Sequence, residues 1–342
     1  MSSLRAIALF ILFVLAAGFL VAFASLIPMS LEIAGAFIAE PPTPVSQTGS
    51  SATPRVARPL LATITSKPVR VAVPSPTPDP LAPHFLFDRP VGVDAPGPIP
   101  NRLYLYGTTE HDEYEVHHGV DFDNNPTGTP LLAVSGGTVV TAGDDREPLC
   151  GDKGDTVCGR HLKFYGLVTV IRLDETYQGR PLFALYGHMD RIDVSVGQHV
   201  RRGDVIGAIG MTGIAIGPHA QLEIRLGEND YASTRNPMLW VQPLAGRGLL
   251  AGRYVNANGE PVQGATIDIY RAEEPTVFYR ETETYGRDEQ GGVNSDEALE
   301  ENFLMNDLPP GEYIVQVIGR TYRRQITIQE GELTFVELGG AR

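Results

Sequence analysis

The sequence predicts a mainly β protein with two β regions in tandem, preceded by an apolar segment and a proline-rich segment. Between residues 84 and 245, short runs rich in Val, Ile and Tyr are separated by glycine turns, as at 167–171 and 182–186. Such runs are typical of strands, and long amphipathic helical periods are missing from this stretch. The apolar content of 42% is enough for a sizeable core, which excludes a wholly disordered chain.

The charge balance narrows the classes of partner. The chain has 27 Lys and Arg against 41 Asp and Glu, which gives a formal net charge of −14. Because binding to phosphate needs a basic surface, this balance argues against a generic nucleic-acid binder, and no nucleic-acid partner is expected.

Residues 1–40 are expected to act as a signal anchor or a signal peptide. Ala6 to Ile27 are 22 uncharged, mostly apolar residues, which as a helix would reach ~33 Å and match the bilayer core. Arg5, the only charge before this run, places the N-terminus in the cytoplasm and the rest outside. Ala22-Phe23-Ala24 offers a cleavage site, whereas the apolar character continues to Ala39 and favours the anchor. Either way the remainder is expected to be extracytoplasmic, held at the membrane or secreted after cleavage.

Residues 41–83 are expected to form a disordered, extended linker. This stretch holds 11 prolines in 43 residues, interleaved with Ser, Thr and Ala. Because proline lacks a backbone N–H and cannot continue a helix or a central strand, the segment is predicted to be a solvated spacer.

Residues 248–342 predict a small β-sandwich. Asn256–Pro261 has the composition of a hairpin turn, Thr266–Tyr270 alternates as a strand does, and Leu308–Val317 predicts a turn followed by a strand. The Asp and Glu residues of this region are scattered, which favours a solvated acidic surface over a calcium site.

Cys150 and Cys158 lie in a polar loop between two strands of the first β region. Two cysteines are too few for a disulfide framework or a zinc ribbon, so any metal site must use His and carboxylate side chains. In an exported chain, a disulfide between the two is the expected state.

Histidines stand out in three stretches: Val116–Phe122, Leu185–Met189 and Gly217–Arg225. On a straight strand, His117 and Asp121 would lie ~13 Å apart, too far to share one metal ion. A bend is therefore required between them, and Gly119 can supply it. In the third stretch polar and apolar residues alternate, so His219 and Gln221 are expected to point into one cleft. The other histidines, His84, His111, His161 and His199, are expected to be solvated or structural.

His117-His118-Gly119-Val120-Asp121, then His188, then His219-Ala220-Gln221 follow in this order along the chain. They resemble the H-x-G-x-D motif, the strand-end histidine and the H-x-H motif of the lysostaphin/LytM-type peptidoglycan metalloendopeptidases. The resemblance covers most of residues 100–242 and implies the family's β-sheet fold for 84–245. It also implies zinc ligands at His117 and Asp121 and catalytic histidines at His188 and His219, in an enzyme that cleaves peptidoglycan cross-link peptides.

Gln221 departs from the family pattern, which has a histidine there as the third zinc ligand. An amide oxygen is a weaker donor than imidazole and is not among the usual ligands of zinc. Three outcomes follow: Gln221 ligates weakly, His118 or His219 substitutes for it, or the cleft holds no metal and binds peptide without cutting. His118 follows a ligand by one residue and would face away on a strand, which argues against it.

The C-terminal motifs at 258–265 and 308–313 resemble the carboxypeptidase-regulatory, or transthyretin-like, β-sandwich. This resemblance implies a fold and no particular ligand. The leading hypothesis is an exported, membrane-anchored zinc metalloendopeptidase of the cell wall whose metal site is weakened at Gln221. Its rival is an inactive relative that binds wall peptide or regulates another wall hydrolase.

Overall fold

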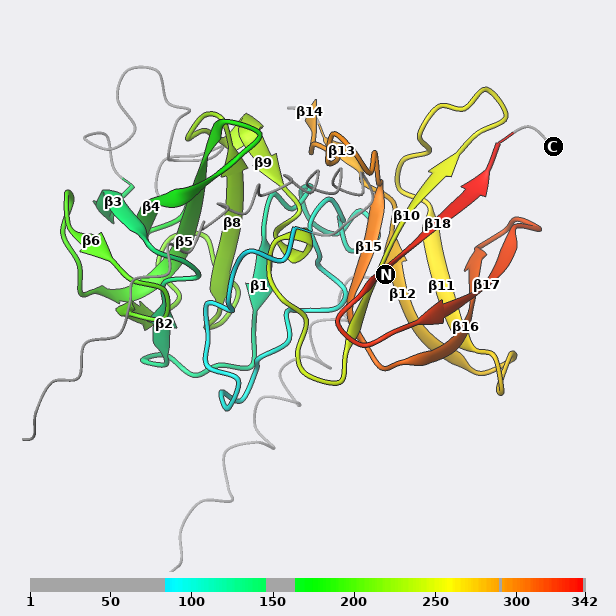
Figure 1. The fold of residues 1–342 in the computed structure, drawn as a ribbon, viewed down its shortest axis with the longest axis horizontal. Coiled ribbons are helices and arrows are strands. Elements are labelled where there is room, and N and C mark those ends of the chain that lie inside the picture. The colour runs from blue at the N-terminus through cyan, green and yellow to red at the C-terminus, as the bar shows by residue number, and fades with distance from the viewer. Residues whose placement is uncertain (1–83, 146–163, 289–290, 341–342) are drawn as a thin grey trace, which may run out of the picture. The chain divides into compact units, whose positions relative to one another are not determined.

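A computed structural model describes residues 84–145, 164–288 and 291–340 (Figure 1). The expected anchor, the proline-rich linker, His161 and the two cysteines Cys150 and Cys158 lie outside these residues. The described part consists of strands, loops and two short 3-10 helices, η1 (Tyr231–Ser233) and η2 (Pro237–Leu239). Within it, no helix has both the length and the apolar character that a membrane crossing needs. The mainly β prediction is confirmed for this part of the chain.

The first β region forms one sheet of nine strands. They are β1 (Val120–Phe122), β2 (Pro130–Leu132), β3 (Gly137–Asp144), β4 (Leu167–Tyr177), β5 (Arg180–Ile192), β6 (His199–Val200), β7 (Val205–Ile209), β8 (Ala220–Leu226) and β9 (Thr234–Arg235). The main path runs β1-β8-β5-β4-β3-β6, with β7 pairing β5 and β2, and β9 pairing β8. Because β8 lies between β1 and β5, Asp121, Gln221 and Gly187 form one row across the sheet.

Strand β5 is irregular at the predicted catalytic histidine. His188 has a left-handed backbone with φ of 57°, and the pairing of β5 with β7 shifts register between Met189 and Arg191. A non-glycine residue in this region is uncommon and often marks a position under constraint. The irregularity turns the backbone at the point where β5 reaches the cleft described below.

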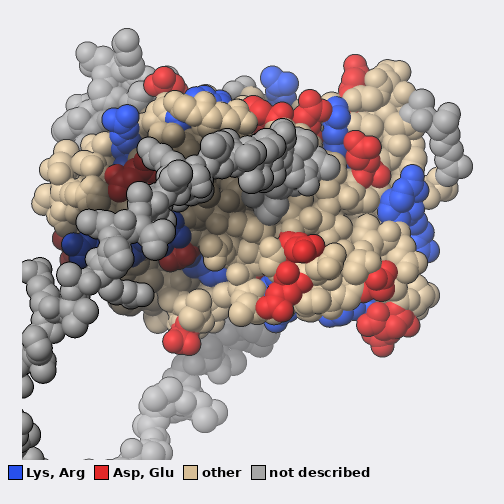
Figure 2. Space-filling model, in the orientation of Figure 1, with Lys and Arg blue, Asp and Glu red and all other residues tan. Residues whose placement is uncertain are grey.

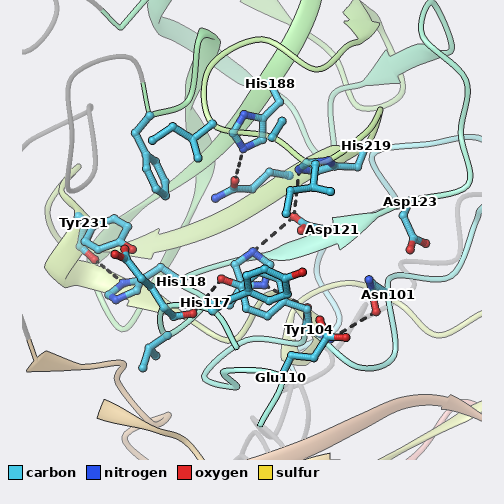
Figure 3. Close-up of a pocket in the computed structure, with 18 residues that line it drawn as sticks. Asn101, Tyr104, Glu110, His117, His118, Asp121, Asp123, His188, His219 and Tyr231 are labelled. Atoms are coloured by element: carbon cyan, nitrogen blue, oxygen red, sulfur yellow. Dashed lines mark hydrogen bonds and ion pairs between the residues drawn. The ribbon is translucent and has the colours of Figure 1, made fainter. Parts of the chain in front are cut away.

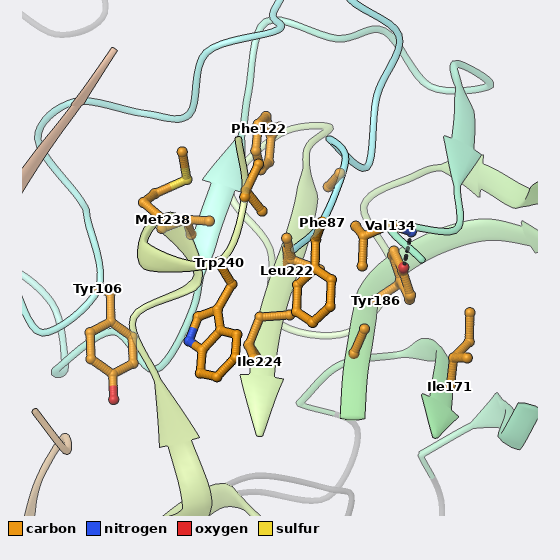
Figure 4. Packing of buried hydrophobic residues seen from close by; sticks show 14 of the residues in the cluster. Phe87, Tyr106, Phe122, Val134, Ile171, Tyr186, Leu222, Ile224, Met238 and Trp240 are labelled. Atoms are coloured by element: carbon orange, nitrogen blue, oxygen red, sulfur yellow. Dashed lines mark hydrogen bonds between the residues drawn. The ribbon is translucent and has the colours of Figure 1, made fainter. Parts of the chain in front are cut away.

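One face of the sheet covers the hydrophobic core (Figure 4). Leu222 and Ile224 of β8 and Phe122 of β1 are fully buried there with Phe87 and Trp240. Successive side chains on a strand point to opposite faces, so Gln221 and Glu223 face the other side of β8. The predicted alternation is therefore confirmed, but all seven residues of β8 are buried, including the polar ones.

The C-terminal β region, residues 248–340, contains two larger sheets that share a second hydrophobic core. One sheet has the order β15-β10-β18 and the other β12-β11-β16-β17. The strands are β10 (Gly248–Val255), β11 (Thr266–Arg271), β12 (Phe278–Glu283), β15 (Phe303–Leu308), β16 (Gly311–Val317), β17 (Arg323–Ile328) and β18 (Leu333–Gly339); β13 (Arg287–Asp288) and β14 (Gly291–Gly292) form a small separate pair. Residues 256–261 form the predicted hairpin turn, which is closed by an antiparallel bridge between Val255 and Pro261, and the chain then passes from β10 in one sheet to β11 in the other. Figure 2 shows acidic side chains spread over the visible surface of this region, with basic ones between them.

The two β regions are joined through buried contacts. Leu249, Ala251 and Leu304 of the C-terminal β region belong to the hydrophobic core of the first. Arg89 pairs with Asp307, and both side chains are buried. All described residues fall within one compact unit, so the boundary predicted near residue 246 separates two sheet systems that share a core.

Candidate functional site

A cleft of about 430 Å³ opens on the polar side of β8 and β1 (Figure 3). Its lining includes all five residues that the sequence selected, which are His117, Asp121, His188, His219 and Gln221. These residues come from three stretches that are far apart along the chain. The structure thus brings them together, while their roles stay predictions.

His117 lies just before β1, with its Nε2 atom 3.4 Å from Oδ1 of Asp121. Its Nδ1 atom lies 3.1 Å from the carbonyl oxygen of Tyr104, and the Tyr104 ring stacks on the imidazole at 4.1 Å and 2°. Because a carbonyl can only accept, Nδ1 carries a proton and donates it. Burial lowers the pKa of His117, but the attraction of Asp121 outweighs burial and leaves that pKa raised.

The chain bends at His118 and Gly119, directly before β1, as predicted. The Gly119 backbone is not left-handed. A Cβ atom at this position would lie only 2.7 Å from the carbonyl oxygen of Leu222, so the strand pair closes because there is no side chain. His117 meets Asp121 because the chain bends between them, before β1 begins at Val120.

Asp121 carries an unusual buried oxygen. Oδ1 accepts no hydrogen bond from any described residue, although it lies 3.4 Å from His117 Nε2 and 3.7 Å from His219 Nε2. The Nδ1 atom of His219 lies 3.0 Å from the carbonyl oxygen of Gly217, so it too is the donor nitrogen. Burial favours the neutral acid, but His117 and His219 outweigh it and lower the pKa of Asp121 to about 2.

His188 is bonded through both ring nitrogens. Nδ1 lies 2.8 Å from the carbonyl oxygen of Thr212, and Nε2 lies 2.7 Å from the side-chain oxygen of Gln221. These two acceptors favour the doubly protonated ring. Burial, with the neighbouring His219, acts the other way and leaves the pKa of His188 lowered.

The side-chain amide of Gln221 is oriented by the buried ion pair between Glu223 and Arg225. Its nitrogen donates to Oε1 of Glu223 at 3.1 Å, and a carboxylate can only accept, so the amide oxygen must face His188. Arg225 donates twice to the other Glu223 oxygen, at 2.9 and 2.7 Å, and the Tyr165 hydroxyl donates to Oε1. Glu223, Arg225 and Tyr165 are fully buried. The sequence placed Glu223 and Arg225 on the polar face but assigned them no role, and nothing in it pointed to Tyr165.

His118 is directed to a different part of the cleft. Its Nδ1 atom lies 3.0 Å from both the Tyr231 carbonyl oxygen and the Thr234 hydroxyl, and its ring stacks on that of Tyr231 at 3.7 Å. These contacts agree with the expectation that His118 faces away from Asp121.

The candidate ligand atoms of the cleft meet the geometry of a zinc site only in part. A tetrahedral zinc with bonds of about 2.0 Å separates neighbouring ligand atoms by about 3.3 Å. His117 Nε2 and Asp121 Oδ1 match this spacing, and the unbonded Asp121 oxygen suits a cation. The third ligand is missing, because Gln221 turns its oxygen to His188, and no group of three or more His, Cys, Asp or Glu among the described residues is placed to hold a metal. As arranged, the residues do not fit a zinc site with three protein ligands.

Three histidines outside the cleft have structural contacts. His84 forms a buried pair with Asp296 at 2.8 Å. His199 forms an exposed pair with Asp174 at 2.9 Å. His111 contacts Glu281 and Glu283 of the C-terminal β region, each at 3.0 Å. Their expected structural or solvated character agrees with these positions.

The site lies within a part of the chain that matches the model of a known protein family. Residues 115–233, which contain all five site residues, match the model of peptidase family M23. The chain is 29% identical over 137 residues to lysostaphin of Staphylococcus staphylolyticus, covering 40% of this chain and 24% of that protein. It is 36% identical over 108 residues to the peptidoglycan DD-endopeptidase ShyA of Vibrio cholerae, covering 32% of this chain and 20% of that protein. The chain thus spans a quarter or less of the length of these relatives.

A solved structure gives a further similarity. The catalytic domain of the antimicrobial peptidase lysostaphin from Staphylococcus simulans is 27% identical, with a TM-score of 0.29. The match covers 36% of this chain and 77% of that one. The resemblance predicted for most of residues 100–242 is confirmed by the family match over residues 115–233. The predicted likeness of the C-terminal β region to a carboxypeptidase-regulatory sandwich stays a prediction.

Proposed function

We propose that this chain is an exported, hydrolase-like protein that binds the cross-link peptides of peptidoglycan in the cleft. The observation that carries the proposal is that His117, Asp121, His188 and His219 line one cleft within the region that matches the peptidase family. Relatives named lysostaphin and peptidoglycan DD-endopeptidase support peptidoglycan as the ligand. The expected export by residues 1–40 agrees with a ligand outside the cytoplasm.

The chemistry of the cleft suits a peptide backbone. Asp121 Oδ1 lacks a hydrogen-bond donor among the described residues and would accept from a peptide N–H. His117 and His219 each turn Nδ1 to a backbone carbonyl, which leaves Nε2 on the side of Asp121. The rings of Tyr104 and Tyr231 add apolar surface to the lining. A few polar groups within an apolar lining would orient the peptide.

In this proposal Gln221 takes the place of the third metal ligand and weakens the metal site. Its amide is held between His188 and Glu223, so turning the oxygen towards a metal would break two hydrogen bonds. Even changes next to metal ligands typically cost ~10–100-fold in affinity or activity. We therefore expect low zinc occupancy, with hydrolysis slow or absent.

Zinc-dependent hydrolysis of the same peptides is the second candidate. One observation favours it: the buried oxygen Oδ1 of Asp121 accepts no hydrogen bond from the described residues and lies at a zinc-like spacing from His117. In that case His117 and Asp121 would hold the ion.

Two further parts of the proposal concern partners. The chain would be held at the membrane by residues 1–40, or secreted if that segment is cleaved. A binding protein without cleavage would act by presenting wall peptide to another wall hydrolase or by regulating it.

The test uses the purified full chain in detergent with isolated peptidoglycan. Co-sedimentation measures binding, elemental analysis measures zinc, and chromatography measures released fragments. We expect binding that is lost in Asp121→Ala, with zinc far below stoichiometric and no fragments. Stoichiometric zinc with fragments would establish the second candidate instead. Binding that survives both His117→Ala and Asp121→Ala would overturn the cleft proposal, and His199→Ala, which lies outside the cleft, is the matched control.

A further inference from the structure

One wall of the cleft is a strained loop. Glu110, Tyr114 and Glu115 from the segment 107–117 line the cleft together with His117. Three consecutive residues of this segment, Glu110, His111 and Asp112, have left-handed backbones with φ of 50°, 59° and 65°. For residues other than glycine this conformation is unfavourable and persists only where surrounding contacts impose it. Hydrogen bonds within the segment, such as Tyr114 N–H to Thr109 O at 2.9 Å, support this conformation, and contacts from outside the segment add to them.

Glu283, the last residue of β12, contacts the segment from outside. Its Oε2 accepts from the backbone N–H of Thr109 at 2.8 Å, and its Oε1 accepts from the backbone N–H of His111 at 2.7 Å. The Glu283 side chain is only 7% exposed. Hydrogen bonds from backbone N–H groups to a buried carboxylate are among the stronger ones in proteins. One carboxylate of the C-terminal β region thus fixes both ends of the turn at 109–111.

A series of backbone hydrogen bonds connects Gly286, near Glu283, to His117, a predicted metal ligand. Gly286 N–H donates to Gly107 O at 2.7 Å, and Gly107 N–H donates to His117 O at 2.8 Å. His117 N–H returns a hydrogen bond to Thr108 O at 3.1 Å. At Gly107, which has φ of 78°, a Cβ atom would lie 2.3 Å from the Tyr285 ring, so only glycine allows this close approach. The C-terminal β region therefore reaches the backbone of His117 through Gly107 and Thr108.

We propose that Glu283 is a positioning residue for peptide binding, through which the C-terminal β region builds one wall of the cleft. The inference rests on the proposed function, because the ligand is the wall peptide assigned there. It goes further in giving the C-terminal β region, for which the sequence implied a fold and no ligand, a direct part in recognition.

General attachment of the two β regions does not explain the Glu283 contacts. The buried pairs Arg89–Asp307 and His84–Asp296 already join the regions elsewhere. The shared core, with Leu249 and Leu304, joins them as well. Removing the Glu283 carboxylate should therefore release the wall segment while the regions stay docked.

The experiment compares Glu283→Gln and Glu283→Ala with the wild-type full chain. Hydrogen exchange is followed at residues 107–117, and binding to isolated peptidoglycan is measured in parallel. Gln keeps one of the two acceptors, so we expect graded loss of affinity, partial in Gln and about tenfold in Ala. Exchange in the segment should rise in the same order, with exchange in β4 and β5 unchanged. Glu312→Gln, an exposed glutamate on β16, is the matched control.

Each outcome decides the proposal. Unchanged exchange at 107–117 would overturn the hold by Glu283. Raised exchange with unchanged affinity would overturn the role of this wall in recognition. A wild-type chain that binds no peptidoglycan contradicts the proposed function instead, and the exchange comparison then still decides whether Glu283 holds the segment.

Discussion

His188 Nε2 lies 2.7 Å from the side-chain oxygen of Gln221, so the residue that replaces the expected third ligand is bonded to a predicted catalytic histidine. On its other side Gln221 donates to Glu223. The glutamine is thus a bridge between a buried ion pair and the cleft. A side chain that already serves two neighbours is poorly available to a metal ion.

Gln221→His should raise zinc affinity by at least about tenfold. An imidazole at this position would find Glu223 placed to accept its N–H, the arrangement that orients histidine ligands in metal sites. Competition with a fluorescent zinc chelator measures the change. Gln325→His adds an imidazole at an exposed site on β17 and should leave the affinity as it is. Equal affinity in Gln221→His and the wild type would show that residue 221 does not face the metal position.

Arg225→Ala should lower the free energy of unfolding by about 3–5 kcal/mol, because it leaves the buried Glu223 carboxylate unpaired. Urea denaturation followed by tryptophan fluorescence measures this loss, since Trp240 is the single tryptophan and lies in the adjoining core. The control is Arg180→Ala, which removes a half-exposed pair with Glu297 and should cost about 0–1 kcal/mol. Similar losses of unfolding free energy in the two variants would contradict the claim that burial makes the Arg225–Glu223 pair more important than the half-exposed Arg180–Glu297 pair.

Glu301→Gln should remove a pH dependence from the stability of the protein. Burial raises the pKa of Glu301 to about 8, whereas an exposed glutamate ionises near 4.5. Folding therefore takes up a proton between these values, and the wild-type free energy of unfolding should fall as pH rises from about 4.5 to about 8. Thermal melts across this range should show a smaller fall in the variant. The adjacent Glu300→Gln, whose side chain is largely exposed, should behave as the wild type does.

His111 should make the wall segment tighter at mildly acidic pH. The hydrogen bond to Glu281 raises the pKa of His111, aided by Glu283 and by Glu110 on its own segment, and burial opposes the rise. The contribution is complete below the unfolded pKa of about 6.5 and is lost as pH rises through the raised value. Protection of the 109–113 amides should therefore fall as the pH rises above about 6.5. His111→Gln should abolish this trend, and His199→Gln should retain it.

The sequence was sufficient for the part of the site that depends on local motifs. His117 and Asp121 lie four residues apart with a bend at Gly119 between them, and alternation along the later stretch places His219 and Gln221 on the side opposite Leu222, so these local features were enough to predict one cleft. Glu283 had no such signal, because its partners Thr109 and His111 are more than 170 residues away. Tyr165 was hidden for the same reason, since its contact with Glu223 depends on how β4 and β8 flank β5. Long-range contacts between single polar side chains leave no periodic pattern for a sequence to display.

The disulfide expected between Cys150 and Cys158 stays a prediction, as does the anchor, because both concern residues outside those described.

The parallel pairing of β10 with β18 has a consequence for biosynthesis. Residues 249–255 bind residues 333–339, so β10 lacks this neighbour until the ribosome has passed Gly339. The same strand carries Leu249 and Ala251 into the core that the two regions share. The motif residues that line the cleft are thus synthesised well before the C-terminal β region, which supports the segment 107–117, is complete. A chain released early would present the motif residues with one wall of the cleft unsupported.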